Sequence, residues 1–509
     1  MFNTNSRIKN ILLSSFFGVT EQFISYLTAF VFRTVFLMVL SKNYLGISGL
    51  FSNVLQIFSL AELGIGGVIS YRMYEPVKNR DVNKCSGLLH FYKNIYQLLF
   101  WILLVMGAMF YPFLDNIIAD ASEVPADINL NVIYWLFVIQ SATSYLYVYM
   151  QSLLNADQKG YVISFVNTIY NVGSNVLKIV VLIVSKDYTL TLAAGIIINV
   201  LYNIIFSIYI KNSYREIVKC KDVLTKKEKH LIYKDTGALL CHKIGYTVVK
   251  STDSIILSKY VGVVILGIYS NYALIAAAID SVLNRLFGSF VSSIGNMSID
   301  KSREETHNSY KKLLFINMWG SSFCAISLFI LANHFMEIWL DDSFLLKPWI
   351  VLIICINLFM NSSRIINGAF VNANGLFVKD RLRPVFEAVF NLVISVVLVK
   401  RIGIGGVFIG TILSTAMTAW WREPIILYKY VFGQNVKEYF AYNIKWMLLI
   451  AVVGGGLYSV CNVIPVTVFG FCMKLIICVV VINLIYTAIF HKSENFLYYK
   501  NMILGKLKK

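Results

Sequence analysis

The stretch FRTVFLMVLSK, from Phe32 to Lys42, returns in modified form as VKSTDSIILSK, from Val249 to Lys259. Placed one above the other, the two stretches align Arg33 with Lys250 and repeat the closing Leu-Ser-Lys. Each stretch places a basic side chain within a long apolar run. We therefore interpret the chain as two related halves, each with a cation inside a membrane-spanning helix.

The same spacing continues along the chain. Three further pairs of segments match at nearly the same offset: GLFSNVLQI (49–57) with GIYSNYALI (267–275), LNA (154–156) with VNA (371–373), and VVL (180–182) with VVL (396–398). A nearly constant offset over four landmarks indicates an internal duplication. Six predicted spans separate equivalent helices, so the two copies have the same orientation. Parallel repeats of this kind occur in transporters that bind their substrate between the two halves.

Composition places the chain in a membrane. Of its 509 residues, 58% are hydrophobic and 14% are charged, whereas soluble domains carry about 25% charged residues. Apolar runs long enough to cross a bilayer predict fourteen spans: 10–40, 44–71, 86–112, 130–153, 161–184, 190–210, 236–258, 263–290, 311–333, 348–371, 384–400, 404–421, 441–463 and 468–490. The sequence therefore predicts an all-α polytopic membrane protein with two parallel six-helix repeats and two additional C-terminal helices.

Charge gives the expected orientation. Lys and Arg concentrate in one set of loops and in both tails, which predicts that both termini are cytoplasmic. The net charge of +18 follows from this rule, so we expect no nucleic-acid partner. The eight cysteines show no metal-ligand or paired spacing, and we expect no metal or other cofactor beyond a coupling H⁺ or Na⁺. We expect residues 1–225 to form one lobe, 226–433 a second, and 434–509 the last two spans and a cytoplasmic tail.

Thirteen ionisable residues other than histidine lie within the predicted spans. Each costs about 2.5–3.5 kcal/mol at a helix centre, so we expect them to line a wet cavity or to pair with one another. Five basic residues are candidates to bind an anion in a lumen: Arg33, Lys250, Lys243, Arg285 and Arg364. Four carboxylates are candidates for charge balance or ion coupling: Glu62, Asp280, Asp253 and Glu21. The alternative is that these residues form interhelical salt bridges that only fix packing.

Helical spacing favours the cavity. Five polar residues of the seventh span share one face: Lys243, Thr247, Lys250, Ser254 and Ser258. We expect the acidic residues of the predicted external loops, including Glu123 and Asp127, to be solvated. All seven prolines fall at predicted span ends or in loops, so we expect no span to be broken by proline.

Three stretches carry a resemblance to a known family: SGLFSNVLQIFSLAELGIGGVIS (48–70), LNADQKGY (154–161) and VNANGLFVKDRLRP (371–384). With the arrangement of six, six and two spans, they resemble the polysaccharide flippases of the multidrug/oligosaccharidyl-lipid/polysaccharide exporter superfamily. The resemblance implies a V-shaped, two-lobed transporter with alternating access. It implies export of an undecaprenyl-diphosphate-linked oligosaccharide repeat unit across the bacterial cytoplasmic membrane, for capsule or O-antigen assembly.

The resemblance also implies roles and partners. It implies that Arg33 and Lys250 contact the diphosphate or acidic sugars, and that Glu62, Asp253 and Asp280 exchange protons or sodium. Its implied partners are the polyprenyl-diphosphate-linked oligosaccharide and membrane lipid, with a polysaccharide polymerase and glycosyltransferases acting in the same process.

Other functions stay open at this point. A multidrug or cation antiporter has a carboxylate-rich lumen and often a proline and an acidic residue in its first helix; here the first span has Glu21 but no proline. A flippase for the peptidoglycan lipid precursor fits the same pattern. A membrane glycan polymerase or ligase would need a large external loop with catalytic residues, and no predicted loop is long enough, so we do not expect an enzyme.

Overall fold

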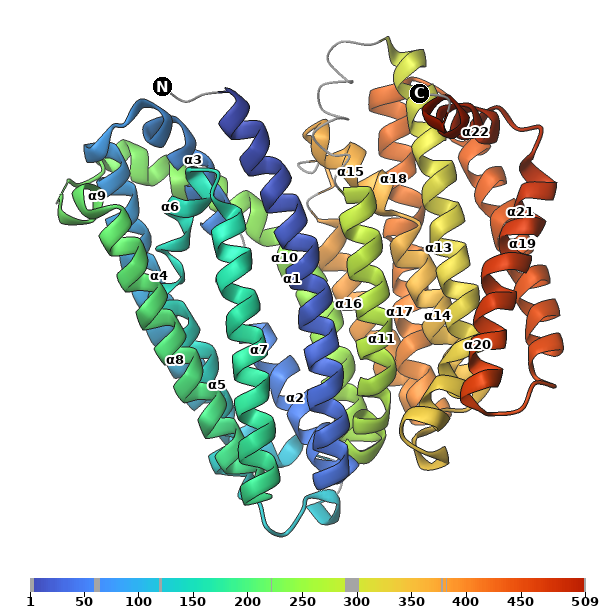
Figure 1. The fold of residues 1–509 in the computed structure, drawn as a ribbon, viewed down its shortest axis with the longest axis horizontal. Coiled ribbons are helices and arrows are strands. Elements are labelled where there is room, and N and C mark those ends of the chain that lie inside the picture. Colours follow the sequence, from blue (N-terminus) through green and yellow to red (C-terminus); the bar gives the residue numbers. More distant parts are fainter. Residues whose placement is uncertain are drawn as a thin grey trace. The chain divides into compact units, whose positions relative to one another are not determined.

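The computed structural model describes the backbone of residues 4–58, 65–118, 121–220, 222–288, 302–376, 379–380 and 382–507. Over these residues the chain is helical and contains no strand. Eleven helical segments are long and apolar enough to cross a membrane (Figure 1). Each of the eleven overlaps one of the predicted spans, so the chain is an all-α polytopic membrane protein, as predicted.

The other three predicted spans are more polar or are interrupted. Span 44–71 falls on α2 (Lys42–Phe58) and α3 (Ile65–Asn79), and span 384–400 falls on α16 (Arg383–Ile402). Span 236–258 lies within α10 (Lys226–Tyr260). A capping box starts α10 well before that predicted span: the Thr225 hydroxyl accepts from the Glu228 backbone N–H, and the Glu228 carboxylate accepts from Thr225. The hydrogen bonds from Thr225 lower the pKa of Glu228 below its usual value.

The chain forms two compact units, 1–267 and 268–509, which divide within α11 (Val263–Gly288). The division comes after α10 because α10 packs on α2 and α3 of the first unit. The lobe boundary that the sequence suggested at 225/226 stays a prediction.

In the first unit, α1 (Thr4–Val39) packs along α7 (Gly160–Ser185), and α7 packs on α8 (Tyr188–Ser213). A second layer is formed by α4 (Val82–Phe110) and α5 (Leu130–Val148), with α5 in contact with α2 and α8. The short helices α6 (Gln151–Ala156) and α9 (Arg215–Lys219) follow α5 and α8. Side chains start two of these helices, because Asn129 and Asp187 accept hydrogen bonds from the first backbone N–H groups of α5 and α8.

In the second unit, α13 (Arg303–Trp339) is the central helix. It packs against α14 (Pro348–Ser362), α15 (Ile365–Ala373), α19 (Lys437–Cys461) and α20 (Val468–Ile477). The remaining helices are α16, α17 (Ile404–Met417), α18 (Ala419–Leu427), α21 (Asn483–Phe490) and α22 (Glu494–Leu507), with π-helical turns at Tyr428–Phe432 and Cys478–Ile482.

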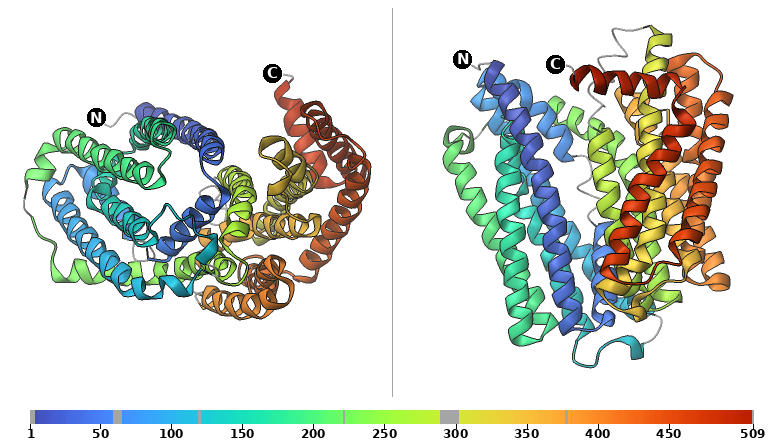
Figure 2. Two further views of the ribbon diagram at one scale, coloured as in Figure 1. Left: turned by 90° about the horizontal axis from the view of Figure 1, so that it is seen from below. Right: turned by 45° about the vertical axis from the view of Figure 1, so that its right-hand side comes forward.

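The two C-terminal spans, which lie outside the sequence repeat, attach to α13 through side chains. The Trp319 indole donates to Asn483 at 2.8 Å, and Tyr486 donates to Ser322 at 3.0 Å. After them, α22 runs across the end of α13 instead of along it (Figure 2). The Tyr499 hydroxyl fixes this crossing by donating to the Lys312 carbonyl.

The duplication is visible in the packing of each unit. In the first unit α4 packs on α5, α5 on α8, and α7 on α8; in the second, α13 packs on α14, α14 on α17, and α16 on α17. The sequence offset aligns these helices pairwise. Both units also break one helix at the same place, since α5 gives way to α6 just before LNA and α14 to α15 just before VNA.

One loop that was expected to be solvated instead holds three segments together. Glu123, in the loop before α5, accepts from the backbone N–H of Val263 at 2.6 Å and so caps the N-terminus of α11. The Glu123 carbonyl accepts from Asn43 of α2, and the Tyr44 hydroxyl donates to Asp127 of the same loop. The expectation of a solvated carboxylate was therefore wrong at Glu123, which is partly buried because a helix N-terminus attracts it, whereas Asp127 is exposed as expected.

Gly262 gives a test of this cap. Its φ of +112° disfavours a side chain, and a Cβ there would lie 2.6 Å from a Glu123 carboxylate oxygen. We expect Gly262→Ala to destabilise the protein by about 1–3 kcal/mol, through backbone strain and loss of the cap. Thermal unfolding in detergent measures this. Gly456→Ala is the control, because Gly456 lies in α19 with open space around its Cβ position. An equal melting temperature for the two variants would contradict the assignment.

Candidate functional site

Arg33 lies beside the packed face of α1. Three residues of α1 mark the face toward α7 and the start of α8. The rings of Phe17 and Phe36 make edge-to-face contacts with Phe165 and Tyr188. The Lys178 ammonium lies over the Phe32 ring, 4.8 Å from its centroid. One residue advances a helix by about 100°, so Arg33 lies to one side of Phe32 and about 60° around the helix from Phe36. Its side chain is partly buried. The lumen role predicted for Arg33 stays a prediction.

The residues that the sequence repeat aligns with α1 lie on α10, where Lys250 corresponds to Arg33. The side chains of Lys243 and Lys250, and all of Glu62, lie outside the described residues. Four small polar residues of α10 are buried, namely Thr247, Ser251, Ser254 and Ser258. Ser251 donates to Gln56 of α2 at 3.5 Å. At these positions the polar stripe of α10 is a closely packed face.

Glu21 belongs to a chain of hydrogen bonds across three helices. Its carboxylate accepts from the Asn167 amide of α7 at 3.0 Å, and the Asn167 oxygen accepts from the Tyr202 hydroxyl of α8. The Tyr202 ring stacks on Tyr170 with centroids 4.3 Å apart. The structure thus links this carboxylate to α7 and α8 through neutral side chains.

Three other predicted residues lie on α10 and α11. Asp253 on α10 and Asp280 on α11 are partly buried, and Arg285 in the last turn of α11 is exposed. The Asp280 carbonyl accepts from the Asn284 amide. Asp253 belongs to the first unit and the other two to the second. Their proposed functions stay predictions.

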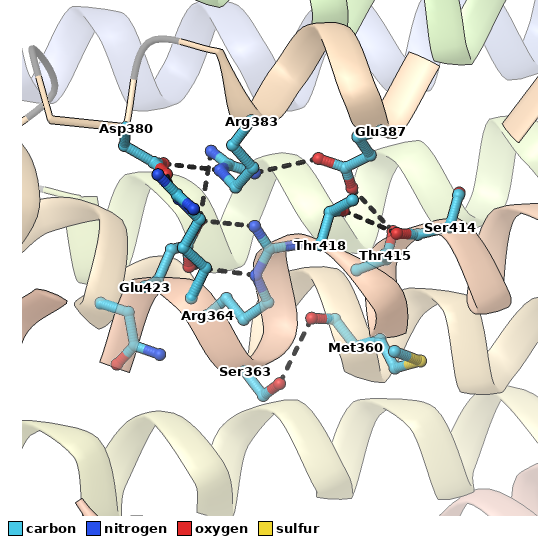
Figure 3. A network of polar contacts seen from close by, with 12 residues as sticks. Met360, Ser363, Arg364, Asp380, Arg383, Glu387, Ser414, Thr415, Thr418 and Glu423 are labelled. Atoms are coloured by element: carbon cyan, nitrogen blue, oxygen red, sulfur yellow. Dashed lines mark hydrogen bonds and ion pairs between the residues drawn. The ribbon is translucent and has the colours of Figure 1, made fainter. Parts of the chain in front are cut away.

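Arg364 lies in a buried ion-pair network within the second unit (Figure 3). Its guanidinium makes two parallel bonds to Glu423 of α18, at 2.6 and 3.1 Å. Only 13% of the Arg364 side chain and 7% of the Glu423 side chain are exposed. A fork-to-fork pair of this kind fixes both partners in direction as well as distance. The salt-bridge role that the sequence left as an alternative is the geometry observed at Arg364.

The network extends through Arg383. This guanidinium contacts Asp380 at 2.6 Å, Glu387 at 2.9 Å and Glu423 at 3.4 Å. Two outer residues are hydrogen-bonded to this network: Arg422 donates to Asp380, and Thr415 donates to Glu387. Three arginines face three carboxylates, so the cluster is neutral and its members compensate one another in the membrane.

The network joins two interrupted helices. The α14–α15 break falls at Ser363 and Arg364, and the α17–α18 break falls at Thr418, whose φ of −125° and ψ of −78° are not helical. Pro424 lies inside α18, one residue after Glu423. The predicted span end at 421 was therefore too early, and the expectation that proline falls only at span ends was wrong here. Arg364 and Glu423 connect the segments that follow the two breaks.

The sequence revealed this network only in part. Arg383 and Glu387 are four residues apart, the spacing of an ion pair on one helix face, so their contact can be predicted from the sequence. Glu423 and Arg422 lay beyond the predicted end of their span, and Asp380 lay in a predicted loop. Their proximity depends on the fold of the second unit, which periodicity does not specify.

A polar hollow of about 470 Å³ opens between α2 and α5 of the first unit. Its lining residues are Ser52, Asn53, Leu55, Gln56, Ser141, Ser144 and Tyr145, none of which is charged. Ser52 and Gln56 lie four residues apart on α2, so they share one face of that helix and contribute to one surface. The contribution of α5 was not predicted.

Comparison with known proteins places the fold. The chain is similar to a structure of the lipid II flippase MurJ, with a TM-score of 0.66, 15% identity, and 94% of this chain and 99% of that one covered. It is also similar to the structure of an inward-facing multidrug resistance MATE family transporter of the MOP superfamily. The TM-score is 0.61 and the identity 13%, and the match covers 80% of this chain and 95% of that one. A Vibrio cholerae MATE transporter matches with a TM-score of 0.57 and 13% identity, over 85% of this chain and 99% of that one.

These likenesses show that the chain has the fold of the MATE and MurJ transporters. Sequence identities this low leave the substrate undecided. No family model and no curated protein matches the sequence.

Breaking the buried pair should be costly. Removing one partner of a buried ion pair typically destabilises a protein by about 3–5 kcal/mol. We expect Glu423→Gln to cost more than Arg364→Met, because the first change removes a carboxylate shared by two arginines, whereas the second leaves Glu423 with Arg383. Unfolding of the purified variants in detergent measures both.

The control is the exposed pair between Lys311 and Glu438, at 2.6 Å. Such pairs contribute about 0–1 kcal/mol, so Glu438→Gln should be nearly neutral. If Glu423→Gln proved as mild as Glu438→Gln, the network would not stabilise the second unit.

Proposed function

We propose that the protein is a flippase that moves a polyprenyl-diphosphate-linked oligosaccharide from the cytoplasmic to the outer leaflet of a bacterial cytoplasmic membrane. The observation that carries this proposal is Arg33, a partly buried cation in the membrane-spanning part of α1. Such a cation is expensive in lipid and is retained where a function uses it. A phosphate group is well matched to a guanidinium, which binds it through parallel hydrogen bonds.

The fold supports a lipid-linked substrate. A protein named as a lipid II flippase shares it over nearly the whole chain, and transporters built from parallel repeats bind substrate near the bilayer midplane. In the proposed cycle the diphosphate binds to Arg33 and Lys250 while the polyprenyl tail stays in the bilayer. Alternating access of the two lobes then exposes the head group to the other side. Surface-polysaccharide assembly by a polymerase and glycosyltransferases is the process that such a flippase would serve.

A multidrug or cation antiporter is the second candidate, favoured by the hydrogen-bonded Glu21 of α1 and by the fold shared with MATE transporters. It predicts efflux of cationic dyes that depends on Glu21. A peptidoglycan-precursor flippase is distinguished by complementation. It would restore transport of the peptidoglycan lipid precursor in cells that have been depleted of their own flippase for that lipid. We expect neither result.

Charge reversal tests the anion site. We expect Arg33→Glu together with Lys250→Glu to abolish export of the surface polymer, because two carboxylates would repel a diphosphate where two cations attracted it. Polymer at the cell surface and the amount of protein in the membrane fraction are measured together.

The matched control is Lys186→Glu with Lys347→Glu, which makes the same change of charge at two exposed loop positions. We expect this control to export normally. Normal export by the Arg33 and Lys250 double variant, at normal abundance, would refute the proposed anion site.

A further inference from the structure

The polar hollow between α2 and α5 has the chemistry of a carbohydrate site. We infer that it binds neutral sugar rings of the transported head group, apart from the diphosphate. This inference rests on the proposed function and specifies which part of the first unit recognises the glycan.

The lining matches a sugar in its hydrogen-bonding groups. Ser52 and Gln56 are exposed to the hollow's open side, and Asn53, Ser141 and Ser144 are partly buried around it. Hydroxyl and amide groups both donate and accept hydrogen bonds, as sugar hydroxyls require. The Ser144 hydroxyl donates to the Ser141 carbonyl of its own helix at 2.7 Å, which leaves its oxygen as an acceptor.

The absence of charge among the seven lining residues argues against a phosphate or a metal ion in this hollow. Its volume of about 470 Å³ falls within the range of about 300–1,000 Å³ typical of small-molecule sites. A neutral, many-hydroxyl ligand could hydrogen-bond to these groups without bringing a charge into the membrane.

The hollow has a fixed aromatic wall. Tyr145 is buried and its ring lies against Tyr96 with centroids 5.8 Å apart. The Tyr96 hydroxyl in turn accepts from Tyr92 at 2.9 Å. On the opposite side, Ser251 of α10 donates to Gln56. Contacts from α4 and α10 therefore hold both walls in place before a ligand arrives, which lowers the entropy cost of binding.

The duplication shows that two of the hollow's polar side chains are specific to the first unit. In the alignment of the two repeats, Ser52 and Asn53 recur as Ser270 and Asn271, but Gln56 is replaced by Leu274 and Ser141 by Leu358. Leu358 is buried in the second unit. The same fold thus accepts leucine at both positions, so its own packing does not require the glutamine and the serine.

This comparison also supplies the variant. Gln56→Leu with Ser141→Leu copies the second unit into the first and removes two hydrogen-bonding groups from the hollow. The probes are undecaprenyl diphosphate and the same lipid carrying a neutral trisaccharide, each titrated against purified protein in detergent. We expect the variant to bind the trisaccharide lipid about tenfold more weakly, as for the loss of one or two hydrogen bonds, and the sugar-free lipid about equally.

Thr143→Val is the control, because Thr143 lies on α5 outside the hollow and donates to the Ile139 carbonyl of its own helix. It should bind both lipids like the wild type. Equal affinity of the double variant and the wild type for the trisaccharide lipid would overturn the sugar site, and so would an equal loss for both lipids, which would indicate a water-filled or structural hollow. If the wild-type protein bound neither lipid, the proposed function would fail instead.

Discussion

The bidentate pair between Arg364 and Glu423 is the interaction on which the second unit depends. Two helices break within this unit, at Arg364 and at Thr418, and a break in a membrane helix leaves polar groups that lipid cannot satisfy. The pair connects the segments after both breaks, and Arg383 extends it to α16. Because three arginines meet three carboxylates, no net charge is buried. Close association of α15, α16 and α18 follows from these contacts.

The described contacts between helices of the first unit include no such pair of opposite charges in its place. Glu21 accepts from Asn167 and Asn167 from Tyr202, which links α1, α7 and α8 without a cation. The polar side chains around the hollow are three serines, an asparagine, a glutamine and a tyrosine. The two halves share their helix packing and their broken helix, yet they have diverged in the use of polarity. The network of the second unit compensates its charges internally, whereas the hollow of the first unit presents an uncharged polar surface.

Periodicity and composition predicted the membrane helices because an apolar run of sufficient length has few other stable placements. The alignment of Arg33 with Lys250 predicted the repeat, since duplication leaves a mark in the sequence itself. The charge network was harder to foresee, because Glu423 meets Arg364 only after two helix breaks that depend on packing. The Glu123 cap was missed for a related reason: loop carboxylates look alike in sequence, and only the fold brings one of them to the N-terminus of α11.

The segments that carry the family resemblance have a structural explanation. In LNADQKGY, Asp157 contacts Lys159 and accepts from Tyr214, just after α8; burial and this hydrogen bond raise the pKa of Tyr214. In VNANGLFVKDRLRP, Asp380 contacts Arg383 and, on α18, Arg422. Each segment lies at the end of a broken helix. Its aspartate connects the loop there to the last part of the same repeat, at Tyr214 after α8 or at Arg422 of α18. A motif with this structural role identifies the fold and says little about the cargo. Selectivity is better sought where the halves differ, at Gln56 and Ser141.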